Sequence, residues 1–62
     1  MKINEMPDGT LEMYGDSSEE KPMTYTRWTG ETIAIPNASK LYFMDNSKFF
    51  MFNSVKNAWN EQ

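Results

Sequence analysis

The segment from Lys40 to Phe52 constrains the fold more than any other part of this chain. It reads as two apolar strands, Lys40–Met44 and Lys48–Phe52, joined by the polar turn Asp45-Asn46-Ser47. Side chains alternate across a strand, and nearly every position of both strands is apolar or aromatic, so both faces of this hairpin are predicted to be apolar. Either the remaining residues of the chain or a second chain must therefore cover two faces.

Alternation divides the side chains of this hairpin into two sets. We expect one face to carry Leu41, Phe43, Phe49 and Met51. We expect the other face to carry Tyr42, Met44, Phe50 and Phe52. The second set is the candidate interface, because aromatic residues and Met are enriched where proteins contact one another. The alternative is that most of these rings form the core, since each buries ~150–250 Å² in a small domain.

Composition limits both the size and the chemistry of the protein. The chain has 62 residues, no cysteine and no histidine, so it fits a single domain without a disulfide or a zinc site of the usual type. The common nucleophile–base pairs cannot be assembled without His or Cys, and a carboxyl acid would need a desolvating cleft that so short a chain can hardly build. We predict no enzymatic activity, no catalytic residues, no cofactor and no bound metal.

The charge is acidic and uneven. Six Lys and Arg stand against nine Asp and Glu, which gives a net charge of −3. Residues 1–31 carry three positive and seven negative side chains, whereas residues 32–62 carry three positive and two negative. A nucleic acid or an anionic membrane surface requires a basic surface, so we expect neither as a partner.

The sequence also bears on location. No apolar stretch typical of a signal peptide follows Met1, and the longest apolar run, Phe49–Phe52, is far shorter than the roughly twenty residues that span a bilayer. We therefore expect neither a signal peptide nor a transmembrane segment.

Turn residues divide the first half of the chain. Pro7-Asp8-Gly9 predicts a hairpin over residues 2–14, with Leu11 and Met13 on its apolar face. Residues 15–22 include four charged side chains and no apolar one, so we expect a mobile acidic loop there. Two short strands are predicted within residues 23–29 and 32–35, which are rich in Thr and aromatic or β-branched residues.

Two conformations are predicted for the end of the chain. Residues 54–59 can form one helical turn, or a tight turn that returns Trp59 to the sheet as a short final strand. The turn is favoured, because so short a segment with two Asn and a Val makes a poor helix. The sequence thus predicts one all-β domain over residues 1–62: two antiparallel hairpins plus short strands in a small sheet or sandwich, with no long helix.

The second half of the chain resembles a short module found in structural proteins of tailed-bacteriophage virions, of the head-fibre or tail-associated type. The resemblance covers residues 38–59. In such modules a Ser opens the first strand, an Asp begins the turn, an aromatic-x-aromatic pair ends the second strand, an Asp or Asn follows, and a Trp closes the unit. The resemblance implies a framework made of Ser39, Asp45, Phe50, Phe52, Asn53 and Trp59.

Composition and resemblance together favour a non-enzymatic virion structural or assembly protein. Its expected partner is itself, in a homo-oligomer, or a larger virion protein that contacts the aromatic hairpin, and its expected location is the virion or the host cytoplasm. The alternative is a small acidic phage-encoded inhibitor that binds a host enzyme through the acidic first half.

Overall fold

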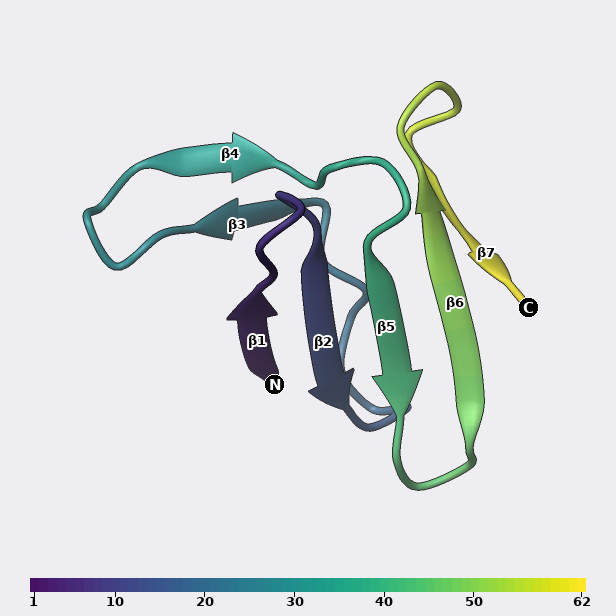
Figure 1. Ribbon diagram of the computed structural model, residues 1–62. Helices are drawn as coiled ribbons and strands as arrows, with labels where there is room; N and C mark the ends of the chain where they lie inside the picture. Colours follow the sequence, from purple (N-terminus) through teal and green to yellow (C-terminus); the bar gives the residue numbers. More distant parts are fainter.

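A computed structural model describes residues 1–62 and contains seven strands and no helix (Figure 1). The strands are β1 (Lys2–Glu5), β2 (Leu11–Gly15), β3 (Thr24–Thr26), β4 (Thr32–Ala34), β5 (Lys40–Phe43), β6 (Lys48–Asn53) and β7 (Ala58–Glu61). Five of them form one sheet in the order β1-β2-β5-β6-β7, and β3 pairs only with β4. The all-β prediction is confirmed, and so are both hairpins, the two short strands and the short final strand.

The centre of the sheet is a parallel pair, which the sequence did not predict. Strands β2 and β5 run parallel, from Glu12 opposite Lys40 to Gly15 opposite Phe43, while every other pair is antiparallel. Parallel neighbours cannot be joined by a tight turn. Residues 16–39 therefore form a crossover, and this crossover contains the β3–β4 hairpin.

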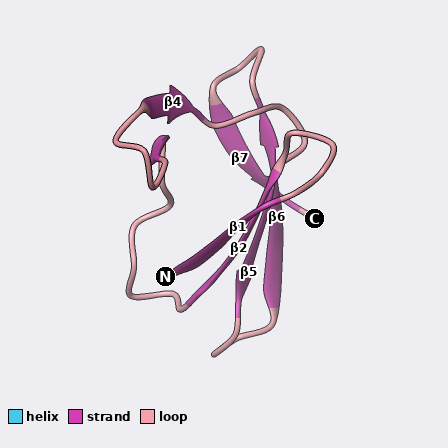
Figure 2. Ribbon diagram, turned by 60° about the vertical axis from the view of Figure 1, so that its left-hand side comes forward, coloured by secondary structure: helices cyan, strands magenta, loops and turns pink.

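The crossover lies on one side of the five-stranded sheet. Figure 2 views the sheet close to edge-on and shows the β3–β4 hairpin, with the loop that leads to it, on a single side. Ile35 of the crossover is buried against the sheet, Tyr25 packs beside it, and the Lys21 ammonium lies 5.5 Å and 4.7 Å from the ring centres of Phe43 and Phe50. We call the side of the sheet that the crossover covers the inner face.

The core lies between the inner face and the crossover. Its buried sheet residues are Leu11, Met13, Leu41, Phe43, Phe50 and Phe52. They come from the three central strands, β2, β5 and β6, and Ile3 on β1 and Trp59 on β7 close the cluster at its two edges. The chain thus builds a core on one face of its main sheet.

The register between β5 and β6 shows that the expected division of faces was wrong. Leu41 lies opposite Phe50 and Tyr42 opposite Phe49. Opposite residues share a face, so Phe50 and Phe52 point inward with Leu41 instead of outward with Tyr42. The reason is the length of the turn: it spans four residues, 44–47, rather than three, because Ser47 adopts a left-handed backbone conformation with φ of 59°. A shift of one residue in register exchanges the faces of a whole strand.

The last strand is fixed to the body by Trp59. Its indole packs edge-on against the Phe52 ring with a centroid distance of 5.0 Å, and its Nε1 donates a 2.7 Å hydrogen bond to the carbonyl oxygen of Pro22 in the crossover. Trp59 thus joins the edge of the sheet to the segment that covers the inner face.

We predict that Trp59→Ala lowers the free energy of unfolding by about 3 kcal/mol, because it removes a packed ring and leaves a carbonyl without its donor. Thermal denaturation followed by circular dichroism measures this change. Trp28→Ala is the matched control: Trp28 is 92 % exposed, so its loss is expected to change stability by no more than about 0.5 kcal/mol. Equal melting temperatures for the two variants would show that Trp59 is peripheral.

Candidate functional site: the outer face of the sheet

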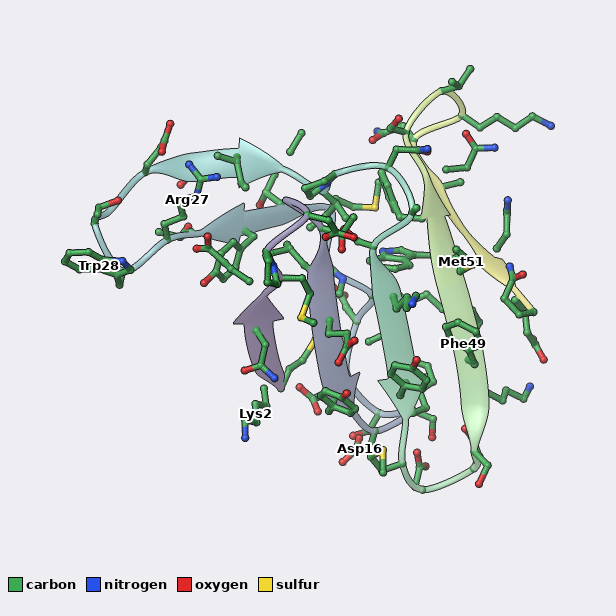
Figure 3. The ribbon with its side chains drawn as sticks, in the orientation of Figure 1. Lys2, Asp16, Arg27, Trp28, Phe49 and Met51 are labelled. Atoms are coloured by element: carbon green, nitrogen blue, oxygen red, sulfur yellow. The ribbon has the colours of Figure 1, made fainter.

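The surface of the sheet opposite the crossover carries aromatic side chains in a row. Tyr14 on β2 lies opposite Tyr42 on β5, and Tyr42 lies opposite Phe49 on β6. All three side chains are partly exposed, as is Met51 on β6. Figure 3 looks onto this side of the sheet and labels Phe49 and Met51. We call this surface, which carries Tyr14, Tyr42, Phe49 and Met51, the outer face.

The three rings of the outer face are stacked on one another. The ring centres of Tyr14 and Tyr42 are 5.2 Å apart with an interplanar angle of 11°, and those of Tyr42 and Phe49 are 4.8 Å apart at 6°. Neighbouring strands are spaced ~4.8 Å apart, so rings at opposite positions meet face to face. Both faces of the central ring, Tyr42, are covered by its neighbours, which leaves that ring no free face on which a nucleic-acid base or a sugar would stack.

A second row on the outer face carries two opposite charges. Glu12 on β2 lies opposite Lys40 on β5, and Lys40 lies opposite Met51 on β6. Glu12 accepts a 2.6 Å hydrogen bond from the Tyr14 hydroxyl, and this bond raises the pKa of Tyr14 because the carboxylate favours the protonated phenol. Lys40 takes part in none of the ion pairs of the chain.

The β5–β6 turn extends the apolar surface beside this face. Met44 is 67 % exposed. It lines a shallow pocket of about 230 Å³ together with Tyr42, Phe43, Ser47 and Lys48. The pocket adds an accessible apolar edge next to the stacked rings.

The structure separates the four residues expected at the interface. Tyr42 and Met44 are accessible and adjacent to one another, whereas Phe50 and Phe52 are only 6 % and 3 % exposed and belong to the core. Phe49 and Met51 occupy the positions that the sequence analysis gave to Phe50 and Phe52. The hairpin predicted over residues 2–14 has Leu11 and Met13 on its apolar face, and nothing in the sequence indicated that β5 would bring Tyr42 beside Tyr14 on the other face.

The four remaining framework residues each make a specific contact. Ser39 is fully buried, and its Oγ accepts a 3.0 Å hydrogen bond from the backbone N–H of Leu11, which ties β2 to the start of β5. The Asp45 carboxylate accepts bonds of 3.0 Å and 2.6 Å from the N–H and hydroxyl of Ser17. Asn53 Oδ1 accepts from the N–H groups of the next turn, at 3.0 Å and 3.2 Å, and Trp59 anchors β7 as described above. These residues organise the sheet and lie outside the outer face.

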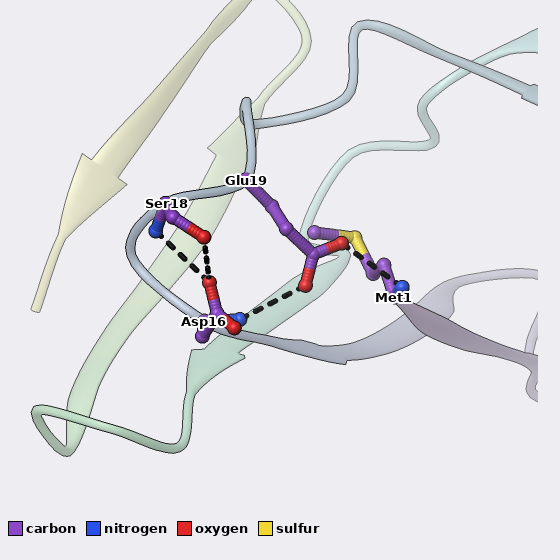
Figure 4. A network of polar contacts seen from close by, with 4 residues as sticks. All are labelled: Met1, Asp16, Ser18 and Glu19. Carbon is purple, nitrogen blue, oxygen red and sulfur yellow. Dashed lines mark hydrogen bonds and ion pairs between the residues drawn. The ribbon is translucent and has the colours of Figure 1, made fainter.

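Two of the three carboxylates of the acidic loop, those of Asp16 and Glu19, are engaged within the chain, whereas Glu20 makes no hydrogen bond or ion pair. Glu19 accepts a 3.1 Å bond from the N–H of Asp16 and forms a 2.9 Å ion pair with the Met1 amine, and Asp16 accepts hydrogen bonds from Ser18 (Figure 4). No group of three or more acidic side chains is arranged to hold a metal ion. The mobility of this loop stays a prediction.

The sequence analysis missed the isolated position of Trp28. This residue lies at the end of the β3–β4 hairpin, where Figure 3 shows it far from the main sheet, and it is 92 % exposed. Next to it, the Arg27 guanidinium pairs with Glu31 at 2.7 Å and approaches Glu5 at 3.7 Å, which holds the hairpin against β1. The turn residues Thr29-Gly30 immediately after Trp28 were the available signal that this ring stands at a hairpin tip.

Comparison with known proteins gives no relative for this chain: no family model, no curated protein and no solved structure matches it. None of its structure forms a helix with the length and apolar character needed to cross a membrane.

The lowered pKa values of three carboxylates make the stability of the fold depend on pH. Hydrogen bonds lower the pKa of Asp45 (mainly from the Ser17 hydroxyl), of Glu19 (mainly from the Met1 amine) and of Asp8 (mainly from the Thr10 N–H). A lowered pKa stabilises the folded state above the usual carboxyl range, and this stabilisation is lost as the pH falls through the lowered values. We expect a constant melting temperature near neutral pH and a decrease below about pH 4, which thermal melts across a pH series will measure.

Asp45→Asn tests one of these three contacts directly. The amide keeps one acceptor for Ser17 but does not titrate, so the fall in melting temperature on acidification should be shallower than in the parent. If the melting temperature of the parent protein rises on acidification, the ionised Asp45 carboxylate does not stabilise the folded state through Ser17.

Proposed function

We propose that this chain is a non-enzymatic structural or assembly protein of a tailed-bacteriophage virion that associates with further copies of itself through the outer face of its sheet. The observation that carries the self-association is the one-sided cover of the sheet, whereas the virion role is what the resemblance of residues 38–59 implies. The crossover buries the inner face, and the outer face keeps a stack of three aromatic rings in contact with solvent. Aromatic side chains and Met are the residues most enriched at protein interfaces.

Two features support a second copy as the occupant of the outer face. The face carries charges of both signs: Lys2 and Lys40 are positive, and Glu12 is negative. It therefore does not require a strongly acidic or strongly basic partner. The stacked rings present no free faces at their centre, which disfavours bases and sugars as ligands. An aromatic sheet face of mixed charge suits contact with the face of another sheet, which is how β-sheets pack on one another.

The inhibitor hypothesis receives less support from the contacts. An acidic surface that binds a host enzyme would use carboxylates that are free to meet cationic groups. Within the acidic loop, Glu19 and Asp16 instead bind the Met1 amine and Ser18, and only Glu20 is left without such a contact. The assembly role therefore remains the better supported of the two.

We predict that Tyr42→Asp weakens self-association by tenfold or more, because a carboxylate in the centre of an apolar contact costs on the order of 1–3 kcal/mol. Sedimentation equilibrium over a range of protein concentrations measures the effect, with circular dichroism to confirm that the variant is folded. Met51→Asp provides a second test on β6 if Tyr42→Asp does not fold.

The control must lie off the outer face and make no contact of its own. Glu20→Ala meets this condition, whereas Glu19→Ala would remove the ion pair with the Met1 amine. Phe50→Asp is unsuitable as an interface variant, because Phe50 is buried and its replacement by Asp would unfold the core. A parent protein that stays monomeric at every accessible concentration would contradict self-association.

A further inference from the structure

The outer face has a pattern that becomes visible when its strands are read across the sheet. One row runs Lys2, Tyr14, Tyr42, Phe49 over β1, β2, β5 and β6. The next row runs Asn4, Glu12, Lys40, Met51 over the same strands. The gap between β2 and β5 divides each row into two halves of two residues, and the two central charges, Glu12 and Lys40, lie on either side of that gap.

We propose that two copies pack outer face against outer face around a two-fold axis that runs parallel to the strands, over the gap between β2 and β5. The arrangement rests on the proposed self-association and specifies its geometry. A two-fold rotation about this axis places β2 of one copy over β5 of the other, and β1 of one copy over β6 of the other. Residues keep their row, because the rotation does not move them along the axis.

This rotation makes the face complementary to itself. Glu12 of each copy meets Lys40 of the other, so the contact contains two symmetrical ion pairs at its centre. Tyr14 meets Tyr42 of the other copy beside them. At the margin, the Lys2 ammonium lies against the Phe49 ring of the other copy, which is a favourable cation–π arrangement.

Neighbouring positions of the axis are electrostatically worse. An axis over β5 places Lys40 of one chain against Lys40 of the other. An axis over β2 places Glu12 against Glu12 in the same way. Both arrangements therefore bury a pair of like charges. An axis between β5 and β6 places Lys40 against Met51 and leaves that charge without a partner in an apolar contact. Only the axis between β2 and β5 pairs both central charges.

The contacts within one chain leave these two charges available. Glu12 and Lys40 lie opposite one another on neighbouring strands, yet no ion pair joins them. Glu12 is positioned by the Tyr14 hydroxyl at 2.6 Å, and its carboxylate has further acceptor sites. Lys40 is partly buried and forms no ion pair within its own chain, although its charge helps to lower the pKa of Asp8; a second copy would supply a carboxylate in contact with it.

The dimer is expected to be weak and to depend on concentration. Four overlapping strands spaced ~4.8 Å apart span about 19 Å, which places the contact near or below the ~1,200 Å² of a standard stable interface. The central ion pairs therefore contribute a large share of the specificity. They lie on the strands next to the axis, where a crossing angle of about 30° between the two sheets moves facing residues least out of alignment.

The test uses complementary charge reversal. Glu12→Lys gives a face with two positive central charges, and Lys40→Glu gives a face with two negative ones. Each variant alone is expected to self-associate at least about tenfold more weakly than the parent protein. Mixed in equal amounts they should form a heterodimer, because both central contacts then join opposite charges, and the double variant Glu12→Lys/Lys40→Glu should recover self-association.

Sedimentation equilibrium of each variant, of the mixture and of the double variant measures these outcomes on the full chain. Glu20→Lys and Lys56→Glu are the controls: they make the same changes of charge away from the outer face and should neither weaken self-association by a comparable factor nor combine preferentially on mixing. Circular dichroism confirms that every variant is folded, and the mixing experiment compares chains that are each already folded.

The possible failures are distinguishable. A parent protein that dimerises while its two charge variants dimerise equally well, or do not combine on mixing, overturns the two-fold arrangement and leaves self-association standing. A parent protein that is monomeric throughout overturns the proposed function together with this inference.

Discussion

The parallel pairing of β2 with β5 is the constraint on which the rest of this structure depends. Parallel strands require a crossover connection, and in this chain residues 16–39 form it. That segment supplies Ile35, Tyr25 and the carbonyl of Pro22 to the inner face. Ser39 fixes the pairing at its start, because its buried hydroxyl accepts the N–H of Leu11. The crossover therefore completes the core, and it does so on one side only.

Within residues 1–62, little is left outside the crossover to cover the other side of the sheet. The remaining segments are the five strands of the sheet and their short turns, so the outer face keeps its aromatic row at the surface. The rings limit their exposure by stacking on one another, since strand spacing matches the contact distance of parallel rings. The proposed self-association follows from this asymmetry and from the opposite charges in the neighbouring row.

The sequence predicted the elements better than their arrangement. Pro7-Asp8-Gly9, the apolar runs around Asp45 and the position of Trp59 gave the local hairpins and the final strand, because turn chemistry and alternation are local properties. The pairing of β2 with β5 joins residues 28 apart, as in the bond from Leu11 to Ser39, and no local pattern encodes it. The composition of the outer face depended on the length of the turn between β5 and β6. Ser47, in a left-handed conformation, lengthens this turn by one residue, so Phe49 lies on the outer face and Phe50 on the inner face. Tyr14 joined the site only through the parallel pairing.

The chain closes one face of its sheet, and we propose that a second copy closes the other. Amide and side-chain chemical shifts recorded by NMR over increasing protein concentration test it residue by residue. We expect concentration-dependent shifts at Tyr14, Tyr42 and Phe49, and at the neighbouring charged pair Glu12 and Lys40, with little change at the crossover residues Ile35 and Tyr25. Shifts that do not depend on concentration, or that gather on the crossover while the outer face stays constant, would contradict it.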